Sequence, residues 1–145
     1  MDLKKIITVS GEPELFMLVN SNPKGIIVEG IESQKRKQIF SYQRINSLED
    51  IAIYTQTGEV PLKEVFVRMY KYLEGQKAID SKSTKDQLTE FFDKFFPEYD
   101  KERFLDGAMK KVVKWYNMLI AKGLVDDKEP EAEEQTENNT QTEEK

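Results

Sequence analysis

The chain has 145 residues, of which 34% are charged and 38% are hydrophobic, and it contains neither cysteine nor histidine. These two absences exclude a disulfide, a thiolate nucleophile, a Cys/His zinc site and an imidazole base. No apolar run approaches the roughly 20 residues of a membrane-spanning helix. We therefore expect a cytoplasmic protein with no membrane span.

The 22 basic and 27 acidic side chains give a formal charge of −5, but this charge is unevenly distributed. Residues 1–60 have a net charge of −1, residues 61–125 of +3 and residues 126–145 of −7. The acidity therefore belongs to the C-terminal tail. The first 125 residues have a net charge of only +2, which gives little long-range attraction to phosphate.

Short β-branched and alternating segments separated by turn residues are typical of strands, and they fill the first part of the chain. The predicted strands cover residues 4–10, 14–20, 25–31, 37–42 and 51–55. Their spacing of about ten residues favours a small antiparallel barrel or a strongly bent sheet. We place this unit at residues 1–60.

The hydrophobic period changes from 2 to 3.6 at Pro61, which predicts a helical region over residues 61–125. The expected helices cover residues 61–74, 84–96 and 100–122. Ser83 or Thr84 is suited to cap the second helix and Asp100 the third. The polar residues 75–82 are predicted to be a linker. Residues 126–145, with no aromatic side chain, are predicted to be a disordered acidic tail.

Catalytic, cofactor-binding and metal-binding residues are not indicated. The seven glycines form neither of the usual phosphate-binding loop patterns. The carboxylates of Asp50 and Asp100 are expected to serve as a turn residue and a helix cap, and no spacing shows acids converging from several elements. We therefore predict that the protein is not an enzyme and has no cofactor.

The third predicted helix has a cationic stripe opposite its broad apolar arc. At 100° per residue, Arg103, Lys110 and Lys114 fall close together, and Trp115 lies at the boundary. This arrangement is suited to contact phosphates and stack on a base. The alternative is an ordinary solvated helix face with a tryptophan that packs on its neighbours.

A second basic feature is the predicted hairpin tip Lys35-Arg36-Lys37. It could grip a phosphate backbone or simply keep an exposed turn soluble. Three aromatic residues of the strand region are candidates either for an aromatic peptide-binding groove or for the core. They are Phe40, Tyr42 and Tyr54.

Several segments resemble a family of small uncharacterised proteins of Bacteroidetes-type bacteria, known as domains of unknown function. The resemblance covers residues 1 to about 122 and departs at residues 104–109. It implies an SH3-like barrel followed by a helical region and brings no known activity, cofactor or partner. The segments that carry it are Asp2-Leu3-Lys4-Lys5-Ile6, Ser10-Gly11-x-Pro13-x-Leu15-Phe16, Leu48-Glu49-Asp50-Ile51-Ala52-Ile53-Tyr54-Thr55, Glu59-Val60-Pro61-Leu62-Lys63-Glu64-Val65-Phe66, Pro97-x-Tyr99-Asp100-x-x-Arg103 and Lys110-Lys111-Val112-Val113-Lys114-Trp115-Tyr116-Asn117.

The sequence thus predicts an α+β protein in which an SH3-like antiparallel barrel is followed by about three helices and an acidic tail. The leading hypothesis is a non-enzymatic binding or adaptor module with a protein partner. The main alternative is RNA or DNA binding through the hairpin tip, the cationic stripe and Trp115. An enzyme with two carboxylates and a divalent metal, and a subunit that pairs through its third helix, are further alternatives.

Overall fold

The computed structural model describes residues 2–41 and 43–127. Tyr42 and most of the predicted acidic tail lie outside the described residues. The elements in chain order are β1 (Ile6–Val9), β2 (Phe16–Asn22), β3 (Gly25–Gly30), β4 (Arg36–Phe40), β5 (Ile45–Ser47), the 3-10 turn η1 (Leu48–Asp50), β6 (Ala52–Thr55), β7 (Gly58–Pro61), α1 (Leu62–Leu73), α2 (Lys85–Phe95) and α3 (Asp106–Ala121).

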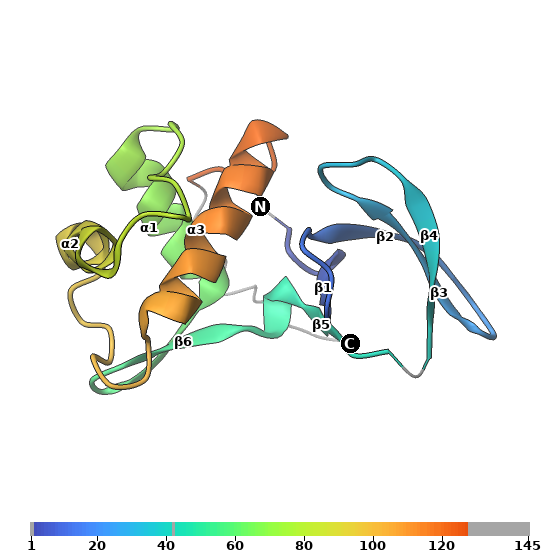
Figure 1. The fold of residues 1–145 in the computed structure, drawn as a ribbon, viewed down its shortest axis with the longest axis horizontal. Coiled ribbons are helices and arrows are strands. Elements are labelled where there is room, and N and C mark those ends of the chain that lie inside the picture. Colours follow the sequence, from blue (N-terminus) through green and yellow to red (C-terminus); the bar gives the residue numbers. More distant parts are fainter. Residues whose placement is uncertain (1, 42, 128–145) are drawn as a thin grey trace, which may run out of the picture.

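Five strands form one antiparallel sheet in the order β4-β3-β2-β1-β5. The first four are a meander, and β5 then returns across the sheet to pair with β1, so that Ile7 lies opposite Ser47. Figure 1 shows this sheet on one side of α3 and the other two helices on the opposite side. The α+β prediction is confirmed.

The described strands do not close into a barrel, because β4 and β5 are the two edges of the five-stranded sheet. The strand predicted at residues 51–55 forms β6, but it joins a separate two-stranded sheet with β7. The pairs Tyr54↔Glu59 and Thr55↔Gly58 enclose a two-residue turn, so one edge of β6 is paired locally. Its other edge is bridged to the segment before α3, where the Asp100 N–H donates to the Tyr54 carbonyl (2.9 Å). The sequence analysis missed both β5 and β7.

The caps explain where the helices begin. Thr84 and Gln87 form a reciprocal capping box at the start of α2, which resolves the alternative between Ser83 and Thr84. Pro61 is the N-cap of α1 and also ends β7, so the helix begins one residue later than predicted. Glu74 then ends α1 in a left-handed conformation.

The predicted start of the third helix at residue 100 is wrong. Asp100 caps a single separate turn, in which its carboxylate accepts from the N–H groups of Glu102 (2.8 Å) and Arg103 (3.1 Å). Phe104 is buried against Phe92, with ring centroids 5.1 Å apart. The backbone becomes extended at the next residue, Leu105, and α3 begins only at Asp106. Burial of Phe104 thus accompanies the break in the helical path.

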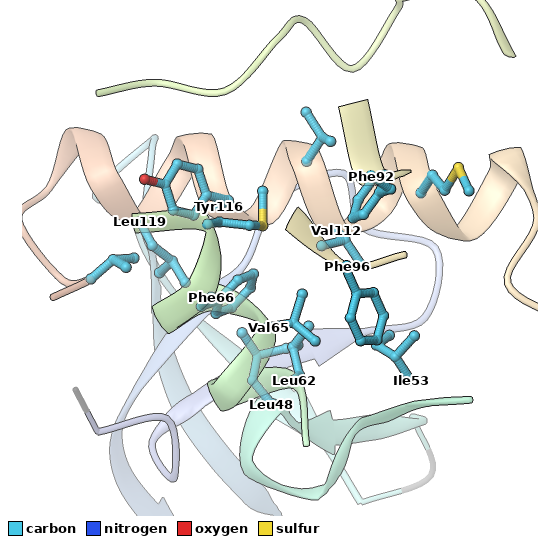
Figure 2. Packing of buried hydrophobic residues seen from close by; sticks show 14 of the residues in the cluster. Leu48, Ile53, Leu62, Val65, Phe66, Phe92, Phe96, Val112, Tyr116 and Leu119 are labelled. Atoms are coloured by element: carbon cyan, nitrogen blue, oxygen red, sulfur yellow. The ribbon is translucent and has the colours of Figure 1, made fainter. Parts of the chain in front are cut away.

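One large hydrophobic core joins the sheet to the helices. It includes Ile6 of β1 together with buried side chains of all three helices. Figure 2 shows Leu48 beside Leu62 of α1, and Ile53 of β6 near Phe96. The opposite face of the sheet has a smaller core of its own, made by Ile7, Val9, Phe16, Val28 and Ile39. The strand and helix regions therefore share their main core.

The segment predicted as a linker is attached to α3. The amide of Asn117 accepts from the N–H of Ala78 (2.8 Å) and donates to the carbonyl of Ile79 (3.1 Å). The Tyr116 hydroxyl donates to the carbonyl of Gln76 (3.1 Å). Burial, with a smaller effect of Tyr70, raises the pKa of Tyr116 to about 12, so this donor remains protonated at neutral pH.

Candidate functional site

A groove runs between α3 and the strands beside it, and it consists of two adjoining pockets. The first, which we call the apolar pocket, has a volume of about 230 Å³ and lies between β6 and α3. The second, the polar pocket, has a volume of about 490 Å³ and lies between α3, β5 and the loop after β1. Ile51, Lys111 and Trp115 line both pockets, so we treat them as one surface, the sheet–helix groove.

The helical period of α3 decides which of its side chains face the groove. Lys111 and Trp115 are four positions apart, and Lys111 and Lys114 are three apart, so all three side chains share one helix face. The neighbouring face carries Val112 and Tyr116 into the core. Trp115 is half-buried against that core and still lines the groove. Core packing thus sets the angle at which α3 presents its lysines.

The apolar pocket has an aliphatic and aromatic floor with cations at its border. Its apolar lining comes from Ile51, Ala52, Ile53, Phe104, Ala108 and Val112. The charged residues that line it are Arg103 and Lys111. The Arg103 guanidinium lies 4.9 Å from the centre of the Tyr54 ring, a cation–π contact that fixes one end of the groove.

Three cations line the polar pocket, namely Arg44, Lys111 and Lys114. Within residues 2–41 and 43–127, none of the three forms an ion pair. Arg103 has only a long contact of 3.8 Å with Asp100. The positive charges of the groove are therefore available to an anionic ligand.

Two carboxylates also line the polar pocket, but both are engaged by the sheet. Glu12 pairs with Lys37 at 2.8 Å. Glu14 accepts from the N–H of Glu32 (2.9 Å), the N–H of Ser33 (3.0 Å) and the Ser33 hydroxyl (2.8 Å). Burial opposes ionisation of Glu14, but the hydrogen bonds from Ser33 and Glu32 outweigh it and lower the pKa of this carboxyl below its ordinary value.

A glycine makes room for this carboxylate. A Cβ on Gly30 would collide with the Ser33 hydroxyl and the Glu14 carboxyl group. Gly30 therefore allows the loop after β1 to be tied to the turn between β3 and β4. These ties hold the sheet side of the groove in place before any ligand arrives.

Four of the residues proposed from the sequence come together in the groove: Tyr54, Arg103, Lys114 and Trp115. Arg103 was predicted to be part of the helical stripe, but it lies outside α3. It reaches the groove from the turn that precedes this helix. Lys110 is exposed and lines neither pocket of the groove. The stripe is thus divided between the groove and the open helix surface.

The cations of the hairpin tip, unlike the groove lysines of α3, are mostly paired with acidic side chains. Arg36 pairs with Glu29 across the β3–β4 ladder at 3.1 Å, and Lys37 pairs with Glu12. Lys37 also lies 5.4 Å from the centre of the Phe16 ring. Lys35 is exposed in the turn. Two of the three tip cations are therefore already paired with acids of the sheet region.

The predicted aromatic groove is not formed by its described members. Phe40 is exposed at the end of the edge strand β4, whereas Tyr54 belongs to the separate β6–β7 hairpin. Neither is a core residue, since both are more than 40% exposed. Tyr42 lies outside the described residues.

Sequence reasoning missed Arg44, Lys111 and the apolar pocket. Lys111 could have been found, because it is four positions before Trp115 and hence on the same helix face. Arg44 could not, because it reaches the groove through pairing of β5 with β1, marked by the hydrogen bond from the Ser10 N–H to the Arg44 carbonyl (2.9 Å). The apolar pocket likewise depends on how β6 packs on α3.

Two further properties bear on the chemistry of the described residues. No group of three acidic residues in this part of the chain is arranged to hold a metal ion. None of its helices is long and apolar enough to cross a membrane.

The fold and groove define a class of small α+β protein in which a five-stranded antiparallel sheet and a β-hairpin share a core with three helices. The solution NMR structure of a protein from Bacteroides vulgatus, a structural genomics target, is similar to this chain with a TM-score of 0.72. The two are 35% identical, and the match covers 86% of this chain and 90% of that one.

Two family models match adjoining parts of the chain. Residues 3–48 match the domain of unknown function DUF5606, and residues 51–119 match the domain of unknown function DUF6852. The chain belongs to this uncharacterised Bacteroidetes-type family, which confirms the predicted resemblance. No curated protein matches the chain.

Proposed function

We propose that the protein is a non-enzymatic, cytoplasmic binding module whose sheet–helix groove receives a segment of a partner protein. The observation that carries the proposal is the combination of unpaired cations with an apolar pocket in one continuous groove. Such a mixture of a small apolar site and a few oriented polar groups is typical of recognition surfaces. The return of β5 to β1 also supports an SH3-like strand order for β1 to β5 within the predicted unit at residues 1–60, with an open sheet instead of a barrel.

RNA or DNA binding is the second candidate, and the same cations favour it. Trp115 is the observation most suited to it, because an aromatic ring beside lysines can stack on a base. The groove nevertheless includes Glu14, whose ionised carboxylate opposes a phosphate backbone, and Glu12, whose charge is offset by Lys37. Arg103 already lies over the Tyr54 ring, so this exposed ring offers less free surface for stacking. These features favour a protein partner.

The test compares two neighbouring lysines of α3. Both Lys110 and Lys111 are exposed, but only Lys111 lines the groove. Tagged full-length protein and its Lys110→Glu and Lys111→Glu variants are expressed in the native cell, cross-linked and recovered with and without nuclease. The proposal predicts a discrete protein partner that survives nuclease, is retained by Lys110→Glu and is lost with Lys111→Glu.

Two results would contradict this function. If both variants retain the same partners as the unmodified protein, the groove is not the binding surface. If nucleic acid is recovered and the accompanying proteins disappear after nuclease, the nucleic-acid alternative replaces the proposal. Far-UV circular dichroism of both variants establishes that any loss is not a loss of fold.

A further inference from the structure

From the chemistry of the groove we infer that the partner segment is an acidic peptide with one bulky apolar side chain. The apolar side chain enters the apolar pocket, and neighbouring carboxylates lie over the cations that border the two pockets. This inference rests on the proposed function and adds the chemical class of the ligand.

The apolar pocket requires that the ligand carry a bulky apolar side chain, which we call the anchor. Its volume of about 230 Å³ is lined by aliphatic and aromatic side chains, with Ile53 and Phe104 among the buried ones. Burial of one large apolar side chain in such a site contributes much of the affinity of a short peptide. A ligand without an anchor would leave this surface exposed to water.

The positions of the cations set the requirement for acids on both sides of the anchor. Arg103 and Lys111 line the apolar pocket itself, and Lys114 and Arg44 line the adjoining polar pocket. Lys111 and Lys114 are separated by about 4.5 Å along the helix axis. Because an extended peptide advances about 3.3 Å per residue, the acidic residues should lie within a few positions of the anchor.

The acids on the sheet side of the groove favour a peptide with a few separated carboxylates over a nucleic acid. Glu12 and Glu14 occupy the wall opposite α3, but Lys37 neutralises one and the Ser33 turn holds the other. A peptide can place its carboxylates toward α3 and uncharged backbone toward this wall. A nucleic acid has a charge at every nucleotide and cannot avoid the two acids in the same way.

The acidic tail of this chain lacks the anchor. Residues 126–145 carry nine acidic side chains, but their only aliphatic residues are one alanine and one proline. The tail therefore offers charge without a group that fills the apolar pocket. An anchored acidic peptide should bind more tightly than a peptide with the tail sequence.

The single tryptophan of the chain provides a direct probe, because Trp115 lines both pockets. Full-length protein is titrated with acidic peptides of about ten residues, long enough to follow the groove in extended form. The central position is Leu, Phe or Ala, and a further Leu peptide has lysines in place of the acids. The readouts are the NMR shift of the indole N–H and the anisotropy of a labelled peptide.

The acidic Leu and Phe peptides should shift the indole resonance and bind about tenfold or more tightly than the Ala peptide. The lysine-rich peptide should not bind. Lys111→Glu should weaken the Leu peptide about tenfold, whereas Lys110→Glu should change its affinity less than about twofold. Added salt should weaken binding without removing the preference for Leu over Ala.

The inference is overturned if no acidic peptide moves the Trp115 resonance, if Ala serves as well as Leu, or if oligothymidylate binds more tightly than the Leu peptide. The outcome also separates the two proposals. Loss of the cellular partner in Lys111→Glu with no response to acidic peptides would retain the binding function and reject this ligand. Retention of the partner in Lys111→Glu would reject the binding function itself.

Discussion

The two sides of the sheet–helix groove both carry charged residues but hold them in different ways. On the sheet side, Glu12, Glu14 and Lys37 are engaged by ion pairs or hydrogen bonds within the sheet. On the helix side, Lys111 and Lys114 form no ion pair within the described part of the chain. Arg44 is the exception on the sheet side, since it too is unpaired there.

The reason is that the two sides are positioned by different forces. The two loops of the sheet side contribute Leu15 and Ile31 to the main core, and their charged side chains are tied by hydrogen bonds and ion pairs within the sheet region. The helix side is fixed by the apolar face of α3, in which Val113, Tyr116 and Leu119 are fully buried. A helix that is held by its core can leave its charged face free for a ligand. The predictions below test this difference, in order of their expected effect on the free energy of unfolding.

Truncation of Leu119 should have the largest effect. Leu119 is fully buried in the main core, so Leu119→Ala should lower the free energy of unfolding by about 3 kcal/mol. Urea denaturation followed by circular dichroism measures the loss. Leu105→Ala is the matched control, because Leu105 is 49% exposed and should lose less than about 0.5 kcal/mol. Equal losses would show that α3 is not held by its core.

On the sheet side, Gly30→Ala should cost about 2 kcal/mol. The new methyl group would displace the Ser33 hydroxyl or the Glu14 carboxylate and break their hydrogen bonds. Gly107→Ala is the control, since a Cβ there meets open space and α3 should gain up to about 1 kcal/mol. If denaturation midpoints show Gly30→Ala to be neutral, the ties of the sheet side contribute nothing to stability.

The hydroxyl of Tyr116 should make the attachment of α3 sensitive to alkali. The folded protein retains this proton to about pH 12, whereas an unfolded tyrosine loses it near pH 10. The stabilisation is therefore complete below about pH 10 and is lost as the pH rises toward 12, by up to about 2 kcal/mol. Urea denaturation at several alkaline pH values should show a shallower decline for Tyr116→Phe. Identical declines would contradict the burial of this hydroxyl.

The sequence predicted the local features of this fold better than its long-range ones. The capping pair Thr84 and Gln87 and the apolar stripe of the following residues act within one helix, so α2 could be predicted almost to the residue. The start of α3 could not, because the break at Leu105 accompanies the packing of Phe104 on distant aromatic rings. Tertiary contacts there override a continuous helical pattern.

For the groove, too, the sequence predicted local features but not those that depend on long-range contacts. The sequence placed Lys114 in the cationic stripe and Trp115 at the boundary of that stripe, because the helical period alone decides both positions. It could not distinguish Lys37, whose charge is paired with Glu12, from Lys111, whose charge is not. That distinction depends on which loops the sheet brings together, and it is also why Arg44 was missed.

Glu14 should make the free energy of unfolding depend modestly on pH in the acidic range. Its folded pKa is lowered, so its contribution is present above the ordinary value of about 4.3 and is lost as the pH falls through the folded pKa. Because solvent reaches the carboxylate, we expect Glu14→Gln to cost only about 1 kcal/mol at pH 7. Urea denaturation at pH 7 and pH 3 should show a smaller difference between the two proteins at pH 3 than at pH 7. A constant difference at both pH values would mean that the charge of Glu14 is irrelevant.

Reversal of a groove lysine should have the smallest effect on stability and the largest on binding. Lys111→Glu removes no described ion pair, so the free energy of unfolding should change by less than about 0.5 kcal/mol. Lys37→Glu should cost up to about 1 kcal/mol, because it breaks the pair with Glu12 and places two acids together. In parallel titrations with the acidic Leu peptide, Lys111→Glu should weaken binding about tenfold and Lys37→Glu much less. The reverse order would mean that the paired cations of the sheet, and not the free cations of α3, recognise the ligand.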